Sequence, residues 1–134
     1  MLIRLWIVSQ DGHLFLPHTQ GSEIDSVCFA GLISALESVT KAYFKGQLSY
    51  FGTKNRHFTI FKRENLFFVA ACTTKVKDRK IKKKLEYIAE KFIETYPAEK
   101  RAKHFGDVTI YAPFEEKYGI TMMDHLEKIS GWFN

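Results

Sequence analysis

The alternation of apolar and polar residues predicts a chain that begins with a β-hairpin. Residues 2–8 are apolar at nearly every position, which is typical of a strand covered on both faces of its sheet. Asp11-Gly12 is a strong two-residue turn signal, and the apolar residues return at 13–16 before Pro17. We therefore expect a central strand followed by a short antiparallel partner.

A long helix is predicted next, because apolar residues recur at spacings of three and four up to Gly46. Ser22 or Asp25 would cap its first turn, and Gly46 would end it. Its apolar surface is wider than one buried stripe requires. We expect one set to face the sheet: Ile24, Cys28, Leu32, Ala35 and Val39. A second set falls partly outside that arc: Phe29, Ile33 and Tyr43.

Three strand-like runs follow at residues 47–53, 57–63 and 66–72, separated by short polar links. Such links predict an antiparallel meander. The last run is apolar throughout, so we place it at the centre of the sheet, beside residues 2–8. The first run is the most polar, which indicates an edge strand.

The remaining chain is predicted to be mainly helical. A second helix should begin near Asp78, bury one clean stripe and end at Pro97. That stripe consists of Ile81, Leu85, Ile88, Phe92 and Tyr96. Residues 107–112 have the pattern of an extended segment. A third helix is indicated by Tyr118, Met122, Leu126 and Ile129.

Length and composition add constraints. At 134 residues and 46% hydrophobic, the chain has the size and composition of one folded domain, which we place at residues 1–134. No apolar run approaches the roughly 18 residues of a membrane span, and no signal-peptide core follows the start. Cys28 and Cys72 both lie in apolar segments, so we expect reduced, buried thiols and a cytoplasmic protein.

The sequence contains no pattern of catalytic chemistry. Gly46 and Gly52 are one residue too far apart for a phosphate-binding loop, and no serine has glycine two residues away on both sides. The five histidines are dispersed without metal-ligand spacing. We therefore expect no enzyme activity and no metal, nucleotide or flavin cofactor.

The charge is concentrated in one place. The net charge is +5, and residues 75–84 carry seven basic side chains and one acid, so the rest is close to neutral. The first two turns of the second helix would hold Arg79, Lys80, Lys82, Lys83 and Lys84, where the helix dipole is already positive. Either this is a solvated face, or it binds acidic lipid headgroups or an acidic protein. Nucleic acid is disfavoured because the run lacks stacking aromatic residues.

Two segments resemble the longin domains of the SNARE-like superfamily. Residues 3–8 with Asp11-Gly12 are similar to the opening hairpin of those proteins, and residues 56–70 are similar to their fourth-to-fifth strand hairpin. The resemblance covers residues 1–97 well and 98–134 poorly. It implies a five-stranded antiparallel sheet in the order β-β-α-β-β-β-α-α. The first helix would cover one face, and the C-terminal helices the other.

The resemblance also implies a function. Longin domains are protein-binding modules that dock small Ras-like or Rab-like GTPases, or that pair with another longin or roadblock domain in trafficking and GTPase-regulator complexes. This chain resembles a stand-alone module without a SNARE coiled coil. Its candidate partner-binding residues are Phe29, Ile33, Tyr43, Leu48 and Tyr50. The edge strand could support a homodimer, or it could simply face water. The alternative function is a peripheral adaptor that binds anionic membrane through residues 75–84.

Overall fold

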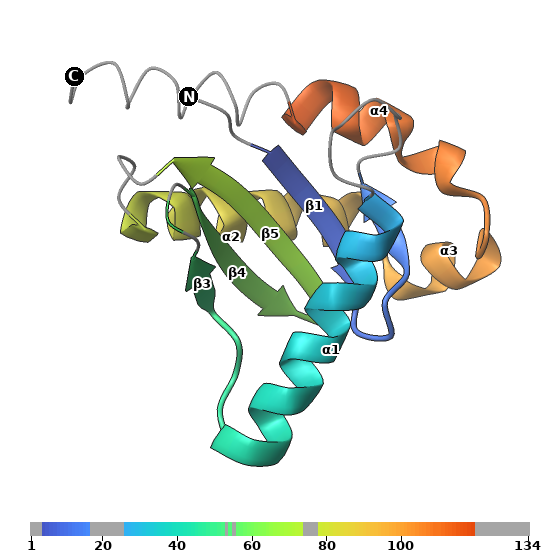
Figure 1. The fold of residues 1–134 in the computed structure, drawn as a ribbon. Coiled ribbons are helices and arrows are strands. Elements are labelled where there is room, and N and C mark those ends of the chain that lie inside the picture. Colours follow the sequence, from blue (N-terminus) through green and yellow to red (C-terminus); the bar gives the residue numbers. More distant parts are fainter. Residues whose placement is uncertain (1–3, 17–25, 53, 55, 74–77, 120–134) are drawn as a thin grey trace.

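The protein is an α+β fold built on one five-stranded antiparallel sheet, with strand order β2-β1-β5-β4-β3 (Figure 1). The computed structural model describes residues 4–16, 26–52, 54, 56–73 and 78–119. The strands are β1 (Arg4–Ser9), β2 (Leu14–Leu16), β3 (Tyr50–Gly52), β4 (Arg56–Arg63) and β5 (Leu66–Thr73). The helical elements are α1 (Ser26–Phe44), α2 (Asp78–Thr95), α3 (Ala98–Lys103), η1 (Val108–Tyr111), α4 (Ala112–Phe114) and η2 (Glu115–Gly119).

The two fully apolar strands are neighbours at the centre of the sheet, as predicted. β1 pairs with β5 along its whole length, with Trp6 opposite Val69. β2 and β3 form the two edges, so the expected edge position of the first meander strand is confirmed, although β3 is only three residues long. In the β1–β2 turn Gly12 has φ 91°, a conformation that glycine adopts without a steric cost.

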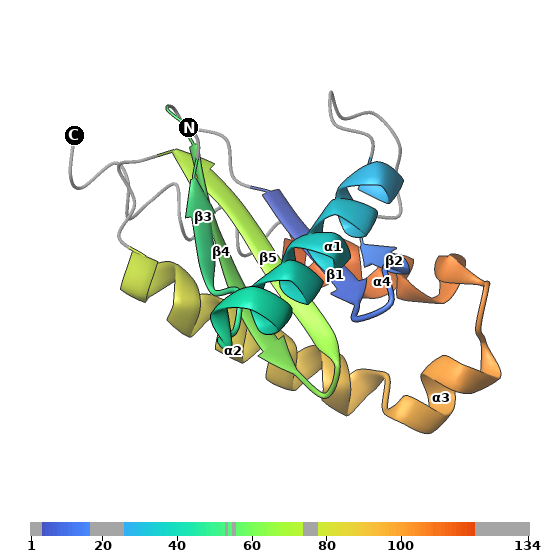
Figure 2. The ribbon, with the colours of Figure 1, turned by 60° about the horizontal axis from the view of Figure 1, so that its bottom comes forward.

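Each face of the sheet has its own apolar core and its own helix. The α1 side contains Trp6, Val8, Phe58, Phe67 and Val69 of the sheet. The α2 side contains Leu5, Ile7, Leu66, Phe68 and Ala70 of the sheet. Figure 2 shows the sheet between the two helices. The predicted arrangement, with the first helix on one face and later helices on the other, is thus confirmed for the described residues. The stripe predicted for α2 is also confirmed, because all five residues are buried.

The predicted extended segment at residues 107–112 is wrong. The Asp107 carboxylate accepts a hydrogen bond from the Thr109 amide at 3.1 Å and thereby begins the 3-10 turn η1. Short helical turns then place Tyr111 and Phe114 against α2, in the core of that face. The predicted third helix begins at Tyr118, which lies in η2, and its other three residues lie outside the described residues.

The end of α1 can be compared with the prediction, whereas its predicted first turn cannot. Ser22, Ile24 and Asp25 lie outside the described residues. The helix ends at Phe44, two residues before the predicted Gly46. Lys45 takes the left-handed conformation at φ 52° that helices commonly use to terminate.

Candidate functional site

The outer surface of α1 is an exposed apolar stripe. Its members recur at helical spacing on the side of the helix that faces away from the sheet, and none of them is charged. We call them the outward stripe: Cys28, Leu32, Ala35, Val39 and Tyr43. Leu32 and Val39 each remain 49% exposed, and Tyr43 is 78% exposed. Solvated helices usually place charged residues on this side, so the stripe is the most unusual surface of α1.

This arrangement reverses the orientation predicted for α1. Phe29 and Ile33 were expected to form part of a docking surface, but they are 6% and 0% exposed and lie in the core on the α1 face. Four of the residues predicted to face the sheet lie in the outward stripe instead, and the fifth, Ile24, lies outside the described residues. The prediction that Cys28 is buried is therefore wrong. Tyr43 is exposed as predicted.

Aromatic packing holds the inner side of α1 in place. The Phe29 ring lies 4.2 Å from the Trp6 ring and 5.6 Å from the Phe58 ring, measured between centroids. Phe51 of β3 stacks on Phe58 at 4.4 Å. Because Trp6 fills the centre of this face, the helix turns its only aromatic residue in the first half toward it. With Phe29 turned toward the sheet, Leu32 lies on the exposed side of α1.

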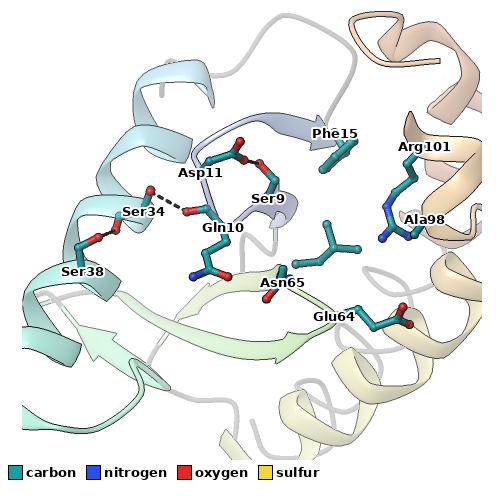
Figure 3. Close-up of a pocket in the computed structure, with 11 residues that line it drawn as sticks. Ser9, Gln10, Asp11, Phe15, Ser34, Ser38, Glu64, Asn65, Ala98 and Arg101 are labelled. Carbon is teal, nitrogen blue, oxygen red and sulfur yellow. Dashed lines mark hydrogen bonds between the residues drawn. The ribbon is translucent and has the colours of Figure 1, made fainter. Parts of the chain in front are cut away.

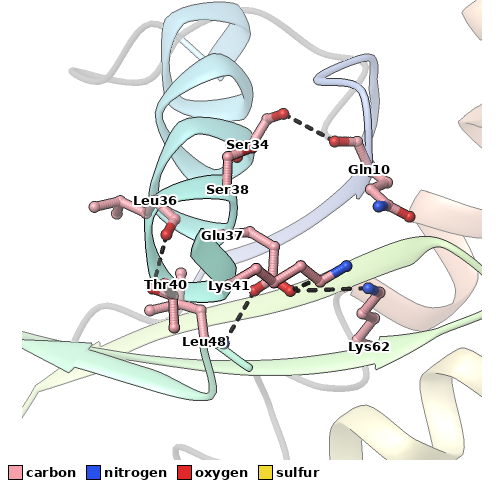
Figure 4. Close-up of polar contacts among 9 residues, drawn as sticks. All are labelled: Gln10, Ser34, Leu36, Glu37, Ser38, Thr40, Lys41, Leu48 and Lys62. Atoms are coloured by element: carbon pink, nitrogen blue, oxygen red, sulfur yellow. Dashed lines mark hydrogen bonds and ion pairs between the residues drawn. The ribbon is translucent and has the colours of Figure 1, made fainter. Parts of the chain in front are cut away.

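A buried carboxylate fixes the second half of α1 (Figure 4). Glu37 is 3% exposed, and its Oε2 accepts a hydrogen bond from the Leu48 amide at 3.0 Å. Its Oε1 lies 3.8 Å from Nζ of Lys62 on β4 and 3.9 Å from Nζ of Lys41. The Lys41 ammonium, together with burial, lowers the pKa of Lys62. Glu37 thus ties α1 both to the sheet and to the segment that leads into β3.

The edge strand β3 adds hydrogen-bonding groups close in the chain to the Leu48 segment that Glu37 holds. Tyr50 is half exposed, and its ring lies 5.6 Å from that of His57. The Ser49 carbonyl accepts from the Ile60 amide at 2.9 Å, so the alternation of an antiparallel ladder turns the N–H and C=O of Tyr50 toward the open edge. Leu48, the other edge residue predicted to bind a partner, is half buried and packs against the core on the α1 face.

A shallow polar groove of about 890 Å³ lies between the β1–β2 turn, the β4–β5 turn, α1 and α3 (Figure 3).

The Ser9 hydroxyl donates to Asp11, and His13 Nδ1 lies 3.2 Å from the same carboxylate. The Ser9 hydrogen bond, with a smaller contribution from His13, lowers the pKa of Asp11. In a catalytic triad the imidazole lies between hydroxyl and carboxylate, whereas here the carboxylate lies between them. This geometry does not activate Ser9 as a nucleophile. The contacts instead stabilise the β1–β2 turn.

A buried cysteine and histidine form a pair that sequence reasoning missed. Cys72 Sγ lies 2.9 Å from His57 Nε2, and the two residues occupy opposing positions on β5 and β4. A catalytic thiol must reach its substrate, but Cys72 is 0% exposed and His57 5%. Cys72 is a core residue as predicted. The pairing follows from the strand register, which the two-residue link Glu64-Asn65 between the predicted strands already indicates.

The predicted basic residues occupy the first two turns of α2, which begins at Asp78 as expected. Arg79, Lys82 and Lys83 are exposed, whereas Lys80 and Lys84 are half buried. Glu86 and Glu90 follow in the next turns. The charge along α2 is therefore uneven, with the positive half at its N-terminal end.

By length and composition alone, the segment Val27–Phe44 of α1 could also cross a membrane. Sequence analysis predicted no such segment. Helices that pack in the core of a folded domain meet the same criterion. Here Phe29 and Ile33 are buried against the sheet, and Glu37 makes its contacts from the same helix. Withdrawing α1 would expose Trp6 and leave the Leu48 amide without its acceptor, so we interpret α1 as a sheet-packed helix.

Comparison with known proteins adds no identification. No protein-family model matches the chain, and no curated protein matches it. The functional interpretation therefore depends on the geometry described above and on the resemblance of the two hairpins.

Proposed function

We propose that this chain is a non-enzymatic protein-binding module of the longin type that acts in the cytoplasm. Its docking surface is the outward stripe of α1 together with the open edge of β3. The partner is a small Ras-like GTPase, or a second longin or roadblock domain in a trafficking or GTPase-regulator complex. The observation that carries the proposal is the uncharged, exposed stripe on a helix that already packs Phe29, Ala30 and Ile33 against its own sheet.

The apolar side chains of the outward stripe supply only part of the binding free energy that docking requires. Burying the exposed parts of Leu32, Val39 and Tyr43 would contribute roughly 1–2 kcal/mol each. Association costs about 4–15 kcal/mol, and micromolar affinity requires a net gain of about 8 kcal/mol. The outward stripe alone therefore falls short. Backbone hydrogen bonds to Tyr50 at the edge of β3 would supply directional contacts beside it.

The order and layering of the elements support the longin comparison without identifying a partner. Two strands, a helix, three strands and a second helix follow in the order implied by the hairpin resemblance, and the helices lie on opposite faces of the sheet. Residues 98–119 form several short helical turns, whereas the predicted third helix lies mostly outside the described residues.

Titration of the chain with purified Ras-like GTPases of the same genome, each loaded with GDP or a GTP analogue, tests this proposal. We expect Leu32→Asp and Val39→Asp to weaken binding at least tenfold and to leave the melting temperature nearly unchanged, because both side chains are already half exposed. Tyr50→Pro removes an amide that faces the open edge, so it should weaken binding while the fold persists.

Phe29→Ala is the matched core variant. It should lower the free energy of unfolding by about 3–5 kcal/mol, because it empties the space beside Trp6. Light scattering in parallel detects pairing of two copies of the chain. If binding to a GTPase or to a second copy survives both aspartate variants undiminished, the outward stripe is not the docking surface.

A further inference from the structure

The outer face of α2 combines cations with a tyrosine in a way that the outward stripe of α1 does not. Arg79 and Lys83 are one helical turn apart, as are Lys80 and Lys84, and Tyr87 lies one turn beyond both pairs. These five residues form one continuous surface without an acidic member, and we call it the basic–tyrosine patch. Glu86 lies one turn from Lys82 and Lys83, and Glu90 lies one turn from Tyr87, so both acids border the patch.

Two lysine ammonium groups lie near the tyrosine at the end of this patch. Nζ of Lys84 lies 5.2 Å from the centre of the Tyr87 ring, and Nζ of Lys91 lies 5.7 Å from it. The ring of Tyr118 in η2 meets that of Tyr87 at 6.4 Å, edge to face. Tyr87 nevertheless remains 44% exposed. Tyr87 is thus an exposed aromatic residue with two ammonium groups close to its ring.

We propose that the basic–tyrosine patch binds the surface of an anionic membrane. Clusters of four to eight basic residues on an exposed helix attract acidic phospholipids, at about 1 kcal/mol per residue near the surface. A tyrosine with an apolar ring and a polar hydroxyl is suited to the boundary between headgroups and acyl chains. A nucleic acid would need an open aromatic face for base stacking, and Lys84 and Lys91 already approach the Tyr87 ring.

The position of the patch gives this binding an orientation. α2 covers the face of the sheet opposite α1, as Figure 2 shows. A membrane that contacts α2 therefore leaves the outward stripe of α1 directed away from the bilayer. The energy expected from four cations gives weak, reversible and salt-dependent association, which suits a recruited module more than an anchored one.

Vesicle flotation of the full chain tests the proposal. We expect recovery with vesicles of phosphatidylcholine containing 30% phosphatidylserine in 50 mM salt, and loss of recovery in 500 mM salt or with phosphatidylcholine alone. Arg79→Glu/Lys83→Glu should weaken partitioning at least tenfold. Acidic residues are favourable in the first turns of a helix, so this variant should fold normally.

The matched control is Lys100→Glu/Lys103→Glu, which makes the same change of charge on α3. It should retain most of the binding, and 10 mM inorganic phosphate should not compete. Equal loss in the control would assign the effect to net charge and overturn the proposal. Binding to neutral vesicles that Leu32→Asp removes would transfer the membrane contact to α1 and overturn it as well. The proposal would also be overturned if the chain bound no vesicles, or if it preferentially captured a DNA duplex in the same buffer.

Discussion

At the scale of single residues, Glu37 decides how α1 sits on the sheet. The sequence shows two apolar arcs on this helix, and hydrophobicity alone does not say which arc turns inward. The inner arc contains a carboxylate, which only a site with dedicated partners can accommodate. The Leu48 amide and Lys62 provide them, but they come from the segment before β3 and from β4. Sequence analysis could not supply that information, and it therefore chose the wrong arc.

Removing this carboxylate should destabilise the protein. We expect Glu37→Ala to lower the free energy of unfolding by about 1–3 kcal/mol, because it leaves the Leu48 amide without an acceptor and Lys62 without its counter-charge. Glu37→Gln should cost less, since its amide oxygen still accepts from Leu48. Urea denaturation measures both. The exposed Glu90→Ala serves as control, with an expected change below about 0.5 kcal/mol. Glu37→Ala with wild-type stability would contradict the role assigned to Glu37.

At the scale of elements, the regular parts of the chain were predictable and the irregular parts were not. β1 and β5 were identified as central because both of their faces are apolar, and α2 was identified from a single apolar stripe. Residues 107–112 also alternate like a strand, but Asp107 caps a 3-10 turn that packs Tyr111 onto α2. The alternating pattern favoured a strand, and the Asp107 side chain favoured a helical turn. Only the contact of Tyr111 with α2 decided in favour of the turn.

Two buried tyrosines that pack with α2, Tyr96 and Tyr111, should lower the free energy of unfolding at high pH. Burial raises the pKa of Tyr111 and of Tyr96, and the Tyr96 hydroxyl donates to the Ile110 carbonyl at 2.8 Å. In the unfolded chain both tyrosines lose their protons near pH 10, while the folded protein retains them. Their contribution to stability is therefore complete below pH 10 and is lost as pH rises through the raised values.

Tyr111→Phe keeps the ring and removes the ionisable hydroxyl. We expect its free energy of unfolding to decline less steeply between about pH 9.5 and 11 than that of the wild type. Urea melts at half-unit pH intervals give the slope. The matched control is Tyr43→Phe, whose side chain is exposed. A slope in Tyr111→Phe as steep as in the wild type would show that this tyrosine does not control alkaline stability.

At the scale of the whole molecule, the sheet separates two surfaces of different chemistry. The outward stripe of α1 is apolar and uncharged, and the basic–tyrosine patch of α2 lies beyond the opposite core. The two proposed contacts therefore do not compete for area. A chain bound to a membrane through α2 could still present α1 to a protein partner. Variants on one surface should leave binding at the other unchanged, because the sites share no residue.

Site-specific photo-crosslinking tests the docking claim most directly, because it does not require the partner to be known in advance. A benzophenone amino acid at Val39 places the reactive group on the outward stripe, and the same residue at Glu90 on α2 is the control. We expect the Val39 probe to form one discrete adduct in the native cells, with a Ras-like GTPase, a longin or roadblock protein, or a second copy of the chain. The Glu90 probe should not form it. No adduct at Val39, or the same set of adducts at both positions, would contradict the assignment of α1 as the docking surface.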